Sequence, residues 1–597
     1  MSPPVGTPCA VALRSKGDRD GSGRSRFPRR GDRHDPGPPV PSFAQNGVTP
    51  GQTRIYSTIY SVGVEWDLSG DVNHNATVNV QYRIQGASAW KSGLPLVRVD
   101  NTYNGNGFAG SIFFLNPDTS YEVALDLSDP DGGAENRMLM VATRPLPTLP
   151  TGGRIFHVVP GSGGGDGSAT NPFKGIAAAQ AVAQPRDIFL VHAGSYGGRP
   201  TFSVPGVARN YIVWKGAGDG EALFVDGLNF GASHVWVEGL TVRNQAYATF
   251  SLNCPSDVVV SKNFFFNNHY SIYLQRGGEG WYIADNTIVG DVDPASGSLD
   301  GEGIELNGSF SACGANNHTV AHNSITRVAD GISTPGTNVD IFGNDIFDVS
   351  DDGIETDDGR TNVRVWRNRI HNAYHNGFSF QPQTGAPWYF IRNQVMNNTE
   401  DINKYRQWDR AVFLHNTFAH WQDLTYVRED GQLMSISRNN LWISVLGGRI
   451  WGLSGSIDWR TDLNYDGFDW GGSASPFQLN GVNYSSLASF TSSTGQEARG
   501  IRISHQTCIP TMNVPGNSPT TVPPQYLTLA AGCPAIDAGA VLPNINDGFL
   551  GGAPDFGAYE YGAPLPIYGP RPLNPDPAPA PPTNLKVSWS FACSSAG

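Results

Sequence analysis

The stretch Asn362-Val363-Arg364-Val365-Trp366-Arg367-Asn368-Arg369-Ile370 holds the pattern that decides the fold: a short alternating apolar run, then Asn, one variable residue and an apolar residue. The same pattern recurs, with anchors at Asn263, Asn286, Asn323, Asn344, Asn368, Asn393, Asn416 and Asn440. Successive anchors are 23, 37, 21, 24, 25, 23 and 24 residues apart, so six of the seven steps lie within 21–25. This period, with short strands, is typical of a solenoid that adds one coil per repeat.

Stacked anchors predict ladders of Asn side chains that satisfy the turn backbone from one coil to the next. The 37-residue step contains an insertion at 290–301. We expect this insertion to protrude as a loop, and such loops often rim the binding face of a solenoid.

A second strand follows each anchor, as in Gly353-Ile354-Glu355-Thr356. Because side chains alternate along a strand, the Ile should point inward and the next residue outward. One outward row is then Tyr273, Glu305, Ser333, Glu355, Ser379 and Asn403. The row two residues further on is Gln275, Asn307, Pro335, Asp357, Gln381 and Tyr405. Lys404 falls at an inward position, which requires a slip of the register or a place at the sheet edge.

Composition excludes several function classes. The 597 residues include 72 Gly and 43 Pro, only 16% are charged, and the net charge is −13. These values suit a β-rich extracellular protein with many tight turns. No long basic stripe follows residue 40, which argues against a nucleic-acid partner. No run reaches the roughly 18 apolar residues that a membrane span needs, and we expect a secreted monomer.

The chain divides into four predicted regions. Residues 1–50 are rich in Arg, Asp, Gly and Pro and are expected to be disordered, or to be a misassigned start before an export signal. Residues 51–146 have the alternating runs of a small β-sandwich, 154–562 form the solenoid, and 563–597 are a Pro-rich linker and truncated tail. A short helix at 173–183 should cap the first coil.

Two features of the regions at either end of the solenoid are specific. The segment Leu115-Asn116-Pro117-Asp118-Thr119-Ser120-Tyr121 resembles the tyrosine corner of a fibronectin type III domain, with Trp66 as its core Trp. Cys508 and Cys533 flank one C-terminal segment and either form a disulfide in an exported protein or remain buried thiols.

Residues 155–562 resemble the pectate-lyase-like superfamily of right-handed parallel β-helix proteins. The similarity lies in the segments 351–368, 387–393 and 415–418, and in the C-terminal signatures 533–539 and 554–561. The resemblance implies an all-β protein, a right-handed parallel β-helix solenoid preceded by a small β-sandwich. It also implies activity on polysaccharides, because the superfamily includes lyases, hydrolases, epimerases and phage tailspikes.

The densest functional signal is acidic. Asp351, Asp352, Glu355, Asp357 and Asp358 lie within eight residues, and Asp300, Glu302 and Glu305 belong to the same predicted face. Calcium-dependent lyases of this fold carry a Glu-x-Glu pair, which Glu355-x-Asp357 resembles. The predicted Ca²⁺ ligands are Glu305, Glu355, Asp357 and Asp358. The alternative interpretation is that these acids are solvated turn residues.

The remaining candidate residues surround this acidic face. Catalytic roles are assigned to Glu355 and Asp357, with Lys404, Arg360, His375 and Arg428 as the basic candidates. The predicted substrate-binding residues are Glu305, Gln381, Tyr405, Arg406 and Trp408.

Three functions remain open at this point. The favoured one is a secreted bacterial polysaccharide lyase that cleaves a uronate-containing glycan by calcium-dependent β-elimination. The second is an inverting glycoside hydrolase that uses paired carboxylates on the same face. The third is a non-catalytic glycan-binding or adhesion protein, favoured by the sandwich and by the Pro-rich tail.

Overall fold

A β-sandwich forms the first part of the protein. The computed structural model describes residues 45–308, 312–357, 359–406, 408–427, 434–452, 455–515 and 521–572. One antiparallel sheet consists of β1 (Thr49–Ser57), β2 (Val62–Ser69), β6 (Gly105–Ile112) and β5 (Val97–Asn101). The other consists of β4 (Lys91–Ser92), β3 (Thr77–Ile84), β7 (Ser120–Ser128) and β8 (Ala134–Ala142).

The sandwich core has the predicted Trp and the predicted corner. Trp66 is fully buried among apolar residues of both sheets. The hydroxyl of Tyr121 accepts a hydrogen bond from the backbone N–H of Asn116 at 2.9 Å, which is the local geometry of a tyrosine corner. The resemblance to a fibronectin type III domain stays a prediction.

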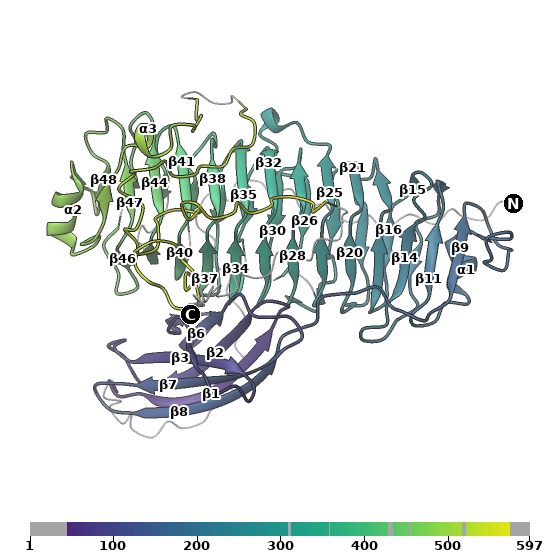
Figure 1. Ribbon diagram of the computed structural model, residues 1–597, viewed down its shortest axis with the longest axis horizontal. Coiled ribbons are helices and arrows are strands. Elements are labelled where there is room, and N and C mark those ends of the chain that lie inside the picture. Colours follow the sequence, from purple (N-terminus) through teal and green to yellow (C-terminus); the bar gives the residue numbers. More distant parts are fainter. Residues whose placement is uncertain are drawn as a thin grey trace, which may run out of the picture. The chain divides into compact units, whose positions relative to one another are not determined.

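The solenoid consists of three long parallel sheets that run side by side along the chain (Figure 1). One coil is β34 (Val363–Trp366), β35 (Arg369–Ala373) and β36 (Phe378–Phe380). These strands pair in parallel with β37 (Trp388–Ile391), β38 (Gln394–Met396) and β39 (Asn403–Tyr405) of the next coil. The predicted right-handed parallel β-helix is thus confirmed.

The third sheet carries the candidate site. Its ten strands are, in spatial order, β22 (Ile272–Tyr273), β26 (Glu302–Glu305), β30 (Asp330–Ser333), β33 (Ile354–Glu355), β36, β39, β42 (Thr425–Val427), β45 (Trp451–Gly452), β48 (Phe477–Leu479) and β49 (Val482–Tyr484). Ile332, Ile354 and Phe378 stack in register and are fully buried in the solenoid core.

The predicted Asn ladder is confirmed. The backbone N–H of Asn344 donates to Oδ1 of Asn368 at 3.1 Å, and that of Asn368 donates to Oδ1 of Asn393 at 3.0 Å. The side-chain amide of Asn368 also donates to the carbonyl of Ile341 at 2.9 Å, so its polar atoms are paired although it is fully buried. Asp466 continues the ladder beyond Asn440. Its Oδ1 accepts a hydrogen bond from the backbone N–H of Asn440 at 2.7 Å.

Shorter elements close the solenoid at both ends. The predicted helix at 173–183 is present as α1 (Ile176–Gln180), which packs on β9 (Ile155–Val159) and β10 (Phe173–Lys174). Near the C-terminus, α2 (Leu487–Thr494) is followed by α3 (His505–Cys508). Cys508 and Cys533 form a disulfide, the first of the two alternatives that the sequence left open, and a second disulfide, between Cys254 and Cys313, was not predicted.

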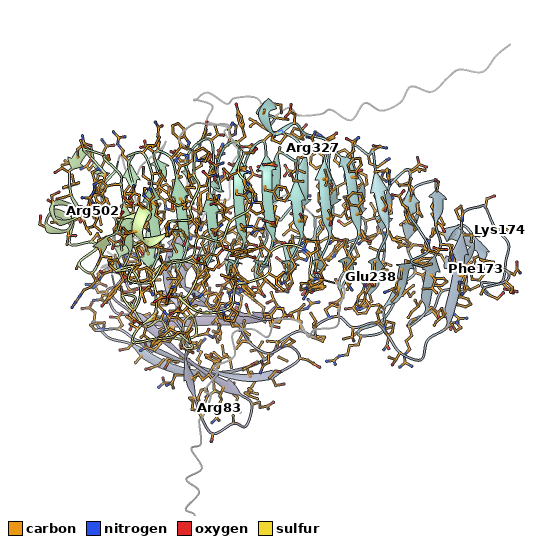
Figure 2. All side chains as sticks on the ribbon, turned by 45° about the horizontal axis from the view of Figure 1, so that its top comes forward. Arg83, Phe173, Lys174, Glu238, Arg327 and Arg502 are labelled. Carbon is orange, nitrogen blue, oxygen red and sulfur yellow. A yellow bond between two sulfur atoms is a disulfide. The ribbon has the colours of Figure 1, made fainter. Side chains whose placement is uncertain are left out.

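The insertion at 290–301 contains the short helix η1 (Pro294–Ser296). A cavity is lined by three residues of the insertion, Asp293, Pro294 and Ala295, together with Arg327. Figure 2 labels Arg327. The hydroxyl of Ser350 donates to the carbonyl of Ser298 at 2.7 Å and so fixes the insertion to a later coil.

Candidate active site

The outward row of the third sheet brings Lys404 beside the acidic residues. Strand pairing aligns Tyr273 with Glu305, Glu305 with Ser333, Glu355 with Ser379, and Ser379 with Lys404. The row is as predicted up to Ser379. Its next member is Lys404 and not Asn403, because the step from Ser379 is 25 residues and not the 24 of the preceding step.

Two predicted substrate-binding residues are buried, and the one-residue slip accounts for the first of them. Tyr405 is fully buried and stacks on Phe380 with ring centroids 5.0 Å apart. Trp408 is also buried, 4.6 Å from the Tyr405 ring. A shift of one position moves every following side chain of a strand to the opposite face. The outward position of Tyr405 was therefore wrong, and both aromatic residues belong to the core.

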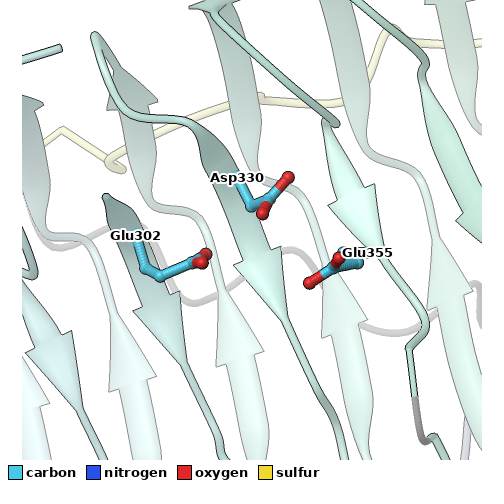
Figure 3. A group of neighbouring side chains, drawn as sticks. All are labelled: Glu302, Asp330 and Glu355. Atoms are coloured by element: carbon cyan, nitrogen blue, oxygen red, sulfur yellow. The ribbon is translucent and has the colours of Figure 1, made fainter. Parts of the chain in front are cut away.

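Three carboxylates from three successive coils converge at the neighbouring strands β26, β30 and β33 of the third sheet. Glu302, Asp330 and Glu355 each place a carboxylate oxygen within 4.8 Å of the other two (Figure 3). A second group of the same size joins Asp330 to Asp351 and Asp352. All five residues are buried, and we call them the acidic cluster.

The local sequence explains why these side chains meet. In the repeat Asp-Gly-Ile, the Gly precedes the inward-pointing Ile, as at Gly353. A Cβ there would lie 2.5 Å from a methyl group of Ile370, so only glycine lets the coils approach this closely. Asp330 Oδ1 accepts from the backbone N–H of Asp352 at 3.0 Å, which stacks the two carboxylates.

Burial and mutual repulsion favour the protonated forms of these acids. Burial, followed by the charge of Glu355, raises the pKa of Asp330 well above its usual value. Burial and the same neighbour also raise the pKa of Asp357, which keeps partial solvent exposure next to the cluster. Oδ2 of Asp330 is buried without a hydrogen-bond partner among the described residues.

Two basic side chains contact the cluster from its accessible side. Nζ of Lys404 donates to Oδ2 of Asp352 at 2.8 Å, and Nδ1 of His375 lies 2.8 Å from Oδ1 of Asp351. The hydrogen bond to Asp351 raises the pKa of His375. Burial lowers the pKa of Lys404, but the charges of Asp352 and Asp351 outweigh it and raise that pKa overall. Lys404 therefore stays protonated at neutral pH.

The other predicted site residues lie at different distances from the cluster. Glu305 and Arg406 are half-buried, and the backbone N–H of Gln381 donates to Oδ1 of Asp357 at 2.9 Å. The guanidinium of Arg360 lies over the ring of Tyr103 of the sandwich, 5.3 Å from its centroid, which disfavours the predicted role as a base. Asp358 and Arg428 lie outside the described residues.

The predicted metal set is only partly assembled. Glu355 belongs to the cluster, and Asp357 contacts it through a side-chain hydrogen bond. Glu302 and Asp330, and not Glu305, complete the converging group. Asp330 was missed by sequence reasoning, although it stands 28 residues after Glu302 and 22 before Asp352, which are coil-sized steps.

A group of aromatic side chains on the preceding coils was also missed. The rings of Tyr247 and Tyr270 stack with centroids 4.7 Å apart, and Tyr273 lies 5.6 Å from each of them. These rings are half-exposed, and Tyr273 pairs directly with Glu305. The 23-residue spacing of Tyr247 and Tyr270 was the available signal, because it equals one coil.

The acidic cluster supports two kinds of chemistry. Converging carboxylate oxygens are the ligands that a hard divalent cation prefers. Crowded buried carboxyls also retain protons at pH values where isolated ones are ionised, which suits general acid catalysis.

One of three comparisons with known proteins, the match to a family model, supports the fold. No curated protein matches the chain. The solved structure "The complex structure of XylC with xylose" is similar over 58% of this chain and 86% of that chain, with 11% identity and a TM-score of 0.34. Among the described residues, no helix is both long and apolar enough to cross a membrane. Residues 295–419, which include the acidic cluster, match the family model of the right handed beta helix region.

Proposed function

We propose that the protein is a polysaccharide-degrading enzyme and that the acidic cluster with His375 and Lys404 is its active site. The observation that carries the proposal is the crowding of five buried carboxyl groups, two of which form ion pairs with Lys404 and His375. Such an arrangement costs folding free energy, so a role in chemistry accounts for it better than a role in stability. The fold is common among enzymes that act on glycans.

We favour β-elimination on a uronate-containing glycan. His375 is the base, because Asp351 holds Nδ1 and leaves Nε2 to take the proton from C5 of the uronate. The electron pair of that C–H bond forms the C4=C5 double bond as the bond from C4 to the glycosidic oxygen breaks. Asp357, whose raised pKa favours its protonated form, donates its proton to the departing oxygen. Protonated Lys404 balances negative charge at the site.

The residues present also fit the expected calcium ion. Their donor set is entirely oxygen, and Oδ2 of Asp330 lacks a hydrogen-bond partner among the described residues. Glu302, Asp330 and Glu355 would hold the ion, which supplies positive charge that stabilises the uronate carboxylate as C5 loses its proton. Two disulfides support the proposal that the protein works outside the reducing cytosol.

A screen of polysaccharides, with and without chelator, tests the proposal. We expect acidic polymers to yield products with the ultraviolet absorbance of a C4=C5 double bond. His375→Ala should lower the rate about 100-fold or more, because general base catalysis is lost. Asp126→Asn, an exposed acid on the sandwich, is the matched control and should not change the rate. Full activity of His375→Ala would contradict the role of His375.

The partly exposed Asp357, whose pKa is raised, also favours a second candidate, a glycoside hydrolase with Asp357 as its acid. Glu355 is hydrogen-bonded to Asp357 and so lies too close to be the base of an inverting enzyme, which needs room for a water between the two carboxyls. The hydrolase would release reducing ends without forming a double bond, and chelator would have no effect. Binding of a glycan without any product after long incubation would exclude both enzymes and leave an adhesion protein.

A further inference from the structure

A cavity of about 350 Å³ lies at the turn between the second and third sheets. We call it the corner pocket. Its lining includes Arg327, Asp348, Asn372, Tyr374 and Trp421, and the insertion at Asp293 forms one rim. A volume near the lower end of the range for ligand pockets suits one small ring and not a large cofactor.

The floor of the corner pocket is a rigid polar ladder. The side-chain amide of Asn372 donates to Oδ1 of Asp348 at 2.9 Å, and that of Asn397 donates to Oδ1 of Asn372 at 2.7 Å. Asn372 also exchanges two hydrogen bonds with the backbone of Val522 from the C-terminal segment. These contacts hold the amides in fixed positions, as a site that recognises hydroxyl groups requires.

Aromatic side chains form the walls. Tyr374 and Trp421 are both half-buried, so part of each ring faces the cavity that they line. The insertion approaches Tyr374 closely, because a Cβ on Gly297 would lie 3.6 Å from its ring. Among the lining residues Arg327 is the only cation, against Asp293 and Asp348, which disfavours a phosphate ligand.

One residue that lines the corner pocket, Tyr374, is next in sequence to a residue that contacts the acidic cluster. Tyr374 precedes His375, which contacts Asp351 of the cluster. The backbone N–H of Tyr374 donates to the carbonyl of Val349 at 2.8 Å, and that of His375 donates to Asp351 at 3.2 Å. The proposed base is therefore the next residue in the chain after Tyr374 of the pocket lining.

We propose that the corner pocket binds one pyranose ring of a polysaccharide, stacked on Trp421 and Tyr374 and hydrogen-bonded to polar groups of the lining other than the amide of Asn372, whose hydrogen bonds are already made within the protein. Flat aromatic faces beside fixed polar groups match the apolar faces and hydroxyl rim of a sugar ring. The inference rests on the proposed function in one respect only, which is that this ring belongs to the polysaccharide that the acidic cluster cleaves.

Affinity measurements on the full chain test the pocket. Glu355→Gln serves as the background, so that bound polymer is not degraded, and neutral and acidic polysaccharides are the probes. Trp421→Ala and Tyr374→Ala, made separately, should each weaken binding of the preferred polymer about tenfold, because each removes one stacking face. Trp459→Ala is the matched control, since Trp459 is an exposed Trp, 41% accessible, that stacks on His74. Thermal unfolding confirms that each variant is folded.

The outcomes separate this inference from the proposed function. If Trp421→Ala and Tyr374→Ala weaken binding but the wild type cleaves no polymer, the pocket is supported and the proposed enzymatic function is excluded. Cleavage by the wild type, with a KM that is unchanged when Trp421→Ala and Tyr374→Ala are made in the wild-type chain without Glu355→Gln, supports the enzyme and overturns the pocket. No binding of any polymer in the panel also overturns the pocket.

Discussion

The Asn ladder and the acidic cluster both bring polar side chains of successive coils together inside the same solenoid, and they differ in how those polar groups are satisfied. In the ladder, Asn344, Asn368 and Asn393 are neutral, and each amide both accepts from and donates to a neighbouring coil. In the cluster, Asp330 faces the like charges of Glu302, Glu355, Asp351 and Asp352.

The contrast separates a structural feature from a functional one. A buried amide with all its hydrogen bonds made stabilises the turn that carries it, whereas crowded buried carboxylates oppose folding unless a proton or a cation offsets them. The protein keeps both within the same coils. We therefore expect substitutions in the ladder to affect stability, and substitutions in the cluster to affect chemistry.

The largest expected effect is on activity. Replacing Glu355 with Gln should lower the rate of polysaccharide cleavage about 100-fold or more, because a carboxylate of the cluster is lost. The free energy of unfolding should stay unchanged or rise by about 1 kcal/mol, since the amide relieves repulsion with Asp330 and Asp357. Initial rates and urea denaturation measure the two quantities. A variant that loses stability in proportion to activity would show that the cluster is structural.

The next effect is on stability. Asn368→Ala should lower the free energy of unfolding by about 3 kcal/mol, because it leaves buried partners unpaired in two neighbouring coils. Asn136→Ala, an exposed Asn on β8, is the control and should change it by less than about 0.5 kcal/mol. Urea denaturation gives both values. Equal stability of the two variants would show that the ladder contributes nothing.

The smallest effect is a pH dependence. The raised pKa of Asp330 means that the folded protein binds this proton more tightly than the unfolded chain does. Its contribution is complete below the usual Asp pKa and is lost as pH rises through the raised value, by at most about 1.4 kcal/mol per pH unit. His375, whose pKa is also raised, contributes with the same sign. Stability of the wild type should therefore fall between mildly acidic and mildly alkaline pH.

Asp330→Asn should flatten this slope, as measured by urea denaturation across a pH series. An Asn variant with the same slope as the wild type would show that Asp330 is not the group that titrates. The slope that remains in this variant comes from the other groups whose pKa is raised, among them His375, Asp352 and Asp357.

Much of the scaffold could be predicted from the sequence. The coil length follows from the spacing of anchors such as Asn344 and Asn368, and the ladder follows because equal steps place identical side chains at the same turn. The inward position of Ile354 and the outward position of Glu355 follow from the alternation of side chains. These features depend on local sequence patterns and not on segments that are distant in the chain.

Only the tertiary structure decided the composition of the site. A coil of 25 residues instead of 24 moved Lys404 onto the outward row and Tyr405 into the core, and no local pattern marks where the extra residue is absorbed. Asp330 joined Glu302 and Glu355 because the coils of 28 and 22 residues still align, which depends on how the insertion folds away from the sheet. Convergence of charges depends on register between coils, and register is fixed by packing across the whole solenoid.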